Sequence, residues 1–100
     1  MEDLSHSDAE RQADIFSVLS NPKRILILRA LAEGELSVGD VAQMVDISMQ
    51  NASHHLRLMK DKGILIRHRK GQSIFYQIAA PEIVAGILEM DPDPAELKDE

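Results

Sequence analysis

The chain has 100 residues, of which 44% are hydrophobic and 28% charged, the balance of one small folded domain rather than of a disordered chain. It has no cysteine, which excludes disulfides, zinc–cysteine sites and thiol chemistry. Aromatic residues make up only 3%, too few for a platform that stacks single-stranded nucleic acid. The sequence shows neither a bilayer-spanning apolar run nor a signal-peptide profile, so we expect a cytoplasmic protein.

The formal net charge of -6 hides a strongly polarised distribution. Residues 1–20 carry five acids against Arg11, and residues 91–100 carry five acids against Lys98. Residues 54–72 instead hold six basic side chains against Asp61 alone. Acidic ends around a basic centre predict that any contact with nucleic acid is made by the middle of the chain.

The first two helices are predicted from their start signals. Ser7-Asp-Ala-Glu10 is a capping box, which opens a helix that runs to about Ser20. Asn21-Pro22 starts a second helix, because Asn caps well and Pro at the first position loses no hydrogen bond. This helix ends at Gly34.

Two further helices and a hairpin follow. Ser37, with Asp40 three residues later, starts a short third helix, and Ser48 caps a fourth that Gly63 closes. The inward residues of the fourth helix are expected to be Ala52, His55 or Leu56, and Met59. Residues 64–69 and 73–78 are rich in branched and aromatic residues and predict two strands, with Gly71 in the turn between them.

A last helix is expected from Pro81 to about Met90. The predicted fold is therefore mostly α with a β-hairpin wing, in the order α-α-α-α-β-β-α. Residues 1–90 form a single domain, and residues 91–100 are expected to be an acidic flexible tail.

The third and fourth helices are joined by the tight Asp46-Ile47-Ser48 turn, a pattern typical of a helix-turn-helix. The second helix of such a unit presents polar residues to the major groove of DNA. Glutamine and asparagine can form paired hydrogen bonds with the edge of adenine, and arginine can do so with guanine. Basic residues in the hairpin can neutralise the charge of phosphates. The candidate DNA-binding residues are Ser48, Gln50, Asn51, Ser53, His54, Arg57, Lys60, Arg67, Arg69, Lys70 and Gln72.

A polar stripe on a surface helix is often only solvated, so a second interpretation stays open. The domain could be a protein–protein interaction module that does not bind DNA, since a fold does not fix a function. The basic hairpin favours DNA, because an interaction module does not need it. An enzyme is not expected: no nucleophile has a base partner at a meaningful spacing, and no Gly-rich phosphate loop is present.

Four stretches together resemble the ArsR/SmtB family of winged helix-turn-helix regulators. They are Leu19-Ser-Asn-Pro-Lys-Arg24-Ile-Leu, the segment 31–42, Ile47-Ser-Met-Gln-Asn-Ala-Ser-His-His-Leu56, and residues 62–76. The resemblance covers roughly residues 10–90, and the Ser53-His-His-Leu56 piece is its most characteristic part.

This resemblance implies a homodimeric prokaryotic repressor that binds an imperfect inverted repeat. It implies that Ser48, Gln50, Ser53 and His54 reach bases and backbone, while the wing touches the flanking minor groove or phosphates. The chain departs from the family at Met49, where a polar residue is common.

Family members often release DNA when a metal binds, but the residues for this are missing here. The place of the family's Cys-Val-Cys sequence is taken by Ser37-Val38-Gly39, and no histidine follows His68. We therefore expect no metal site and no cofactor, and the effector stays unknown. His54 is expected to contact DNA, and His55 to be a partly buried packing or hydrogen-bonding residue. His68 is expected to be a surface group of the first wing strand, with a phosphate contact beside Arg67 or Arg69 as an open alternative.

The terminal helices carry more apolar area than a monomer of this size easily hides. Burying half of it between subunits would stabilise a dimer by many kcal/mol, at roughly 25 cal/mol per Å² and before association costs. A two-fold axis would also set two recognition helices about 34 Å apart, one turn of DNA. The candidate dimer-interface residues are Ile15, Phe16, Leu19, Ile83, Val84, Ile87 and Leu88.

Overall fold

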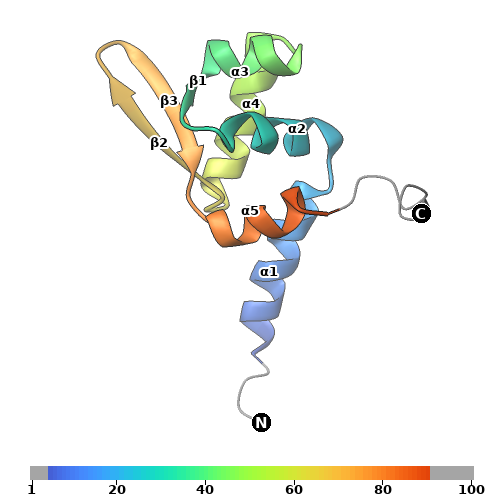
Figure 1. Cartoon of the computed structure of the whole chain (residues 1–100). Helices are drawn as coiled ribbons and strands as arrows, with labels where there is room; N and C mark the ends of the chain where they lie inside the picture. The colour runs from blue at the N-terminus through green and yellow to red at the C-terminus, as the bar shows by residue number, and fades with distance from the viewer. Residues whose placement is uncertain (1–4, 91–100) are drawn as a thin grey trace, which may run out of the picture.

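The computed structural model of the chain describes residues 5–90, which contain five helices and three strands (Figure 1). The predicted tail, 91–100, lies outside the described residues. The elements follow in the order α1 (His6–Leu19), α2 (Pro22–Leu31), β1 (Leu36–Ser37), α3 (Val38–Val45), α4 (Met49–Asp61), β2 (Leu65–Lys70), β3 (Ser73–Ile78) and α5 (Pro81–Leu88).

Three of the four predicted N-caps are confirmed. The Asn21 side chain accepts from the backbone N–H groups of Lys23 and Arg24, at 2.9 and 3.2 Å. Ser37 and Ser48 each accept from the backbone N–H three residues on, at 3.1 and 3.0 Å. These hydrogen bonds fix where α2, α3 and α4 begin, because each satisfies a donor that the helix itself leaves unpaired.

The predicted start of the first helix at Ser7 is wrong by two residues. Ser5 is the N-cap, and its hydroxyl accepts from the backbone N–H of Asp8 at 3.2 Å. The sequence contains two overlapping signals, since Ser5-His-Ser-Asp8 has the same spacing of hydroxyl and carboxylate as Ser7-Asp-Ala-Glu10. The earlier signal wins because it lengthens the helix and still places Asp8 in the first turn, near the positive end of the helix dipole.

The predicted hairpin forms, but as two strands of a three-stranded sheet. β2 and β3 pair antiparallel, and Gly71 supplies the positive φ of 63° that their turn requires. The short strand β1 pairs with the other edge of β3, so the order is β1-β3-β2. The sequence did not predict β1, because two residues are too short to show a period and their pairing partner lies 38 residues away, as in Ser37 and Phe75.

The core is formed mainly by α2, α3 and α4 and is closed by β3 and α5. Ala52, Leu56 and Met59 are fully buried, which confirms the inward face of α4 and selects Leu56 over His55. Tyr76 and Val84 reach the same core from β3 and α5. No helix within residues 5–90 has the length and the apolar character needed to cross a bilayer.

Two of the residues assigned to the dimer interface lie in the core of a single chain instead. Leu19 is 4% and Val84 is 2% exposed, since the end of α1 and the inner face of α5 pack on the subunit's own core. Periodicity identifies an apolar face but cannot tell which partner covers it. Phe16, by contrast, is 62% exposed, and Ile15, Ile83, Ile87 and Leu88 are partly buried.

Candidate nucleic-acid interface

The turn between α3 and α4 has the geometry of a helix-turn-helix. Asp46 ends α3 in the left-handed conformation, with φ 62° and ψ 53°, which a short polar side chain tolerates better than most. The backbone N–H of Ile47 donates to the carbonyl of Ala42 at 3.0 Å, and Ser48 then caps α4. The reversal is thus held by local hydrogen bonds, which set the angle at which α4 leaves α3.

The polar face of α4 lies opposite its buried face. Gln50, His54 and Arg57 are exposed, and Ser53 between them is partly exposed. The Arg57 guanidinium donates to the Ser53 hydroxyl at 3.2 Å, which holds the arginine along the helix surface. The residues at spacings of three and four therefore form one continuous hydrogen-bonding stripe that starts at the first turn of α4.

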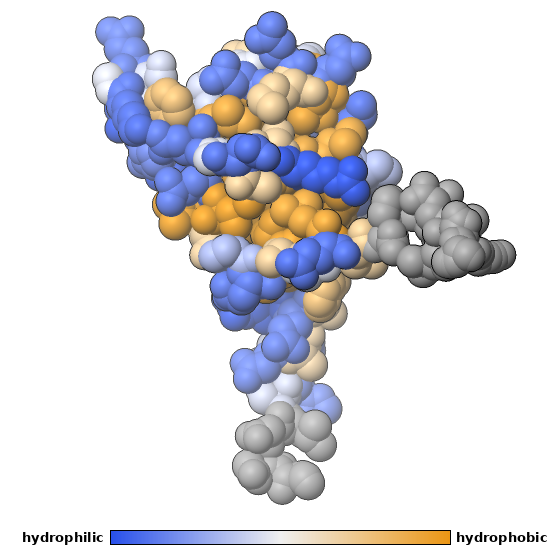
Figure 2. Space-filling view, in the orientation of Figure 1, coloured by the Kyte–Doolittle hydropathy of each residue, from blue (hydrophilic) through white to orange (hydrophobic). Residues whose placement is uncertain are grey.

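All the candidate DNA-binding residues are at least partly exposed. The structure places them on α4 and its N-cap and on the wing, which is β2 and β3 with their turn: Ser48, Gln50, Asn51, Ser53, His54, Arg57, Lys60, Arg67, Arg69, Lys70 and Gln72. Figure 2 shows the wing as the hydrophilic arm at the upper left of the molecule. Their roles stay predictions.

A shallow hollow of about 580 Å³ adjoins the stripe at the start of α4. Its lining combines the polar side chains of Gln50, Ser53 and Arg57 with the apolar ones of Val38 and Met49. Met49 is 57% exposed although it is apolar and stands at the first position of the helix.

His55 is a partly buried, hydrogen-bonded residue, as predicted. Its Nδ1 accepts from Nε of Arg24 on α2 at 3.1 Å, and the same guanidinium donates through Nη1 to the carbonyl of Val18 at 3.0 Å. Burial, the Arg24 charge and His54 lower the pKa of His55 below its ordinary value of 6.5. Arg24 of α2 thus connects His55 on α4 with the backbone at the end of α1.

The wing divides its basic side chains between two faces. Arg67 and Arg69 pair across the ladder with Tyr76 and Ile74, whereas His68 pairs with Phe75 and so faces the other way. The alternative that His68 faces phosphate together with Arg67 or Arg69 is therefore wrong. Alternation along a strand separates neighbours by a full face of the sheet.

His68 and Lys70 contact Glu35, which sequence reasoning missed. Nε2 of His68 lies 2.6 Å from a Glu35 oxygen, and Lys70 forms an ion pair and hydrogen bond with the same carboxylate. The hydrogen bond from Lys70 and the charges of Lys70 and His68 lower the pKa of Glu35 below its ordinary value of 4.5. The segment before β1 is thereby joined to the wing across more than 30 residues of sequence, which no local pattern signals.

The basic side chains of residues 54–72 differ in whether a carboxylate neutralises them. Lys62 pairs with Asp14 of α1 at 2.6 Å, and Lys60 lies 3.1 Å from Asp61. Within residues 5–90 the structure gives no ion pair to Arg57, Arg67 or Arg69. Among the candidate DNA-binding residues, these three arginines therefore keep a positive charge that no described carboxylate neutralises.

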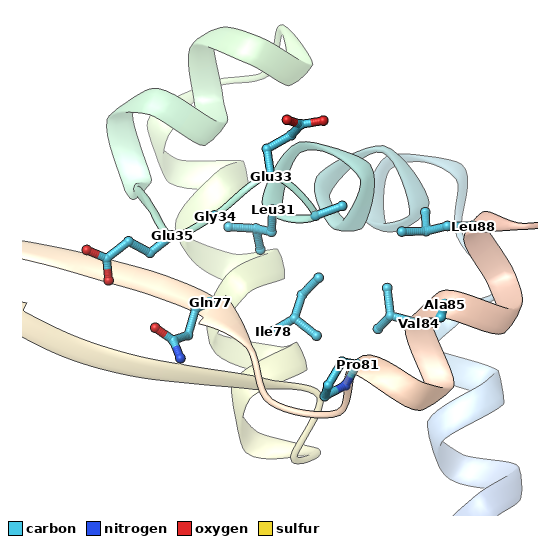
Figure 3. Close-up of a pocket in the computed structure, with 11 residues that line it drawn as sticks. Leu31, Glu33, Gly34, Glu35, Gln77, Ile78, Pro81, Val84, Ala85 and Leu88 are labelled. Atoms are coloured by element: carbon cyan, nitrogen blue, oxygen red, sulfur yellow. The ribbon is translucent and has the colours of Figure 1, made fainter.

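Two apolar hollows lie away from the α4 stripe. One, between α1 and α5, measures about 340 Å³ and is lined by Gln12, Ile15, Phe16 and Ile83. The other, about 470 Å³, lies between α2, β3 and α5. In Figure 3 Leu31, Ile78 and Val84 point into it, whereas Glu33, Glu35 and Gln77 point away, so it offers apolar contact without converging polar groups.

The described residues hold no cluster that fits a metal ion. Within 5–90, no three side chains of the His, Cys, Asp and Glu types lie close enough together to ligate one.

Known proteins are similar to this chain in both sequence and fold. The family model of bacterial regulatory proteins of the arsR family matches residues 21–67. The chain is 38% identical over 65 residues to the transcriptional repressor SdpR of Bacillus subtilis, covering 65% of this chain and 72% of SdpR. The chain spans between 58% and 72% of the length of four curated relatives that it matches.

Two solved structures show the same architecture. The crystal structure of NolR from Sinorhizobium fredii superposes with a TM-score of 0.75 at 35% identity, covering 88% of this chain and 90% of that one. The homodimeric winged helix-turn-helix DNA-binding domain of Mb0332 from Mycobacterium bovis gives a TM-score of 0.76 at 27% identity, covering 88% and 84%. With its helix-turn-helix, its β wing and this degree of identity, the chain belongs to the arsR family of bacterial regulatory proteins.

Proposed function

We propose that the chain is a dimeric transcriptional repressor that acts in the cytoplasm, without catalytic activity, by binding an inverted-repeat operator. In each half-site α4 enters the major groove, and the wing contacts the flanking backbone. The single observation that carries this proposal is the stripe of Gln50, Ser53, His54 and Arg57, held opposite a fully buried face of the same helix. Such a helix presents hydrogen-bonding groups in a fixed orientation, as base reading requires.

The dimer is supported by the surface of α1. Every residue from His6 to Asp14 is exposed, and Figure 1 shows the helix projecting from the body. A helix this short is marginal in water without packing, so the projecting part gains stability from a second copy. Phe16 and the hollow it shares with Ile15 and Ile83 supply the apolar contact that a two-fold interface needs.

The proposed regulator does not sense metals as cysteine- and histidine-bearing members of the family do. Supporting this, the sequence has no cysteine, and Ser37 and Gly39 stand where the thiolates would be. The apolar hollow of Figure 3 is the proposed site for a small apolar effector, because apolar side chains line it.

Gln50→Ala is expected to relax operator preference and to weaken operator binding by about 1–3 kcal/mol, because it removes a side chain that reads a base edge. The operator is first obtained by selecting bound duplexes from a random pool, and affinities are then measured for selected and scrambled duplexes. The matched control is Gln77→Ala, since Gln77 is an exposed glutamine near the end of β3 and is not one of the candidate DNA-binding residues. Unchanged preference in Gln50→Ala would refute the assignment of α4.

Arg69→Ala is expected to weaken every duplex about equally and to make the salt slope of binding shallower by about one, as the loss of one phosphate contact does. Lys70→Ala is expected to change the slope less, because Glu35 already neutralises that charge. Both slopes come from affinities titrated between low and moderate salt. A wild-type affinity that does not respond to salt would favour the protein-interaction module instead.

A further inference from the structure

Met49 is an exposed apolar side chain at the start of α4, beside residues that can form hydrogen bonds. The side chain is 57% exposed at the point where a base-reading helix begins, and it lines the hollow with Val38 of α3. Exposed single apolar residues are common on protein surfaces, but these two face the same space as Gln50, Ser53 and Arg57. An apolar wall beside three hydrogen-bonding groups is a mixed surface that can discriminate among base edges.

The Met49 side chain lies near the start of α3. Its sulfur is 3.8 Å from the point where a side-chain carbon would stand on Gly39, which places the thioether beside the first turn of that helix. Val38 is the first residue of that same turn. The two apolar side chains, from the first residues of α3 and of α4, therefore form one apolar wall of the hollow.

The major groove offers one apolar group to such a wall. Thymine carries a 5-methyl group there, whereas the edges of guanine, cytosine and adenine present hydrogen-bond donors and acceptors. We propose that Val38 and Met49 contact the 5-methyl group of a thymine in each operator half-site, next to the base read by Gln50. This inference rests on the proposed function and adds to it a base preference that comes from methyl contact.

The test replaces each thymine of the selected operator in turn by deoxyuridine, which removes only the methyl group. At one thymine in each half-site the wild-type protein is expected to lose about three- to fivefold in affinity, as the burial of one methyl group predicts. Met49→Ala is expected to bind the thymine and deoxyuridine duplexes equally at that position. Met44→Ala is the matched control: this methionine of α3 is 60% exposed but does not line the hollow, so it should discriminate as the wild type does.

Each result decides a separate question. A wild-type protein that binds all deoxyuridine duplexes as tightly as the parent operator overturns the methyl contact but leaves the proposed repressor function intact. The methyl contact is also overturned if Met49→Ala, shown to be folded by its thermal unfolding transition, still binds the thymine duplex more tightly than the deoxyuridine duplex. Failure to select any duplex overturns both the inference and the proposed function.

Discussion

Phe16→Glu is expected to convert the dimer into monomers and to weaken operator binding by about 100-fold or more. The side chain is 62% exposed in a single chain and lines the hollow between α1 and α5, so a carboxylate there would be buried without a partner charge in the dimer. Losing the second recognition helix removes the effective concentration that links two half-sites, an advantage of about 100-fold or more. Sedimentation equilibrium at micromolar concentration and operator titration measure the two effects.

Two controls separate association from folding. Because Phe16 packs little on its own subunit, thermal unfolding at low protein concentration should show a folded Phe16→Glu monomer. Met44→Glu introduces the same charge at another exposed apolar residue, on α3, and should remain dimeric. A wild-type protein that sediments only as an 11.1 kDa species would contradict the proposed dimer.

Arg24→Ala is expected to lower the free energy of unfolding by about 2 kcal/mol, because it removes charge-assisted hydrogen bonds to two acceptors. The Nδ1 atom of His55 and the carbonyl of Val18 would both lose their donor. Urea unfolding measures the change. Lys23→Ala, an exposed basic residue one position earlier on α2, should stay within about 0.5 kcal/mol of the wild type, and an equal loss in both variants would show that the arginine contacts contribute nothing.

The contact between Arg24 and His55 also makes the free energy of unfolding depend on pH over a defined range. His55 has a lowered pKa in the folded state, from burial first and then from the charges of Arg24 and His54. The unfolded chain therefore takes up its proton first as the pH falls, so stability is highest above about 6.5 and is lost from there down to the lowered folded pKa. His55→Asn, which keeps an acceptor but does not titrate, should flatten this decline between about pH 7.5 and about pH 5.5.

The pH dependence of Glu35 lies in a more acidic range. Its pKa is lowered below 4.5, chiefly by the hydrogen bond from Lys70, so its contribution is present above that value and is lost as the pH falls further. The two groups can thus be told apart in one titration of stability.

Signals confined to a few residues predicted this fold well. Asn21, Ser37 and Ser48 each bond to a backbone N–H two or three residues away, so the sequence alone contains both partners of every cap. The inward face of α4 is equally local, because spacings of three and four put Ala52, Leu56 and Met59 on one side of any helix. The first helix was misplaced only because two such signals overlap.

Contacts between distant segments were decided by the tertiary structure. β1 exists because β3 has an unpaired edge beside it, and Glu35 meets His68 and Lys70 because the sheet register brings them together. Leu19 and Val84 are apolar in the same way as Phe16, yet packing buries the first two and leaves the third exposed. The starts of α2, α3 and α4 and the apolar or polar character of each helix face could be predicted from the sequence, since they depend on neighbours along the chain. Which apolar residues stay exposed and which cations stay without an ion pair depends instead on what packs across long sequence separations, so only the folded chain shows it.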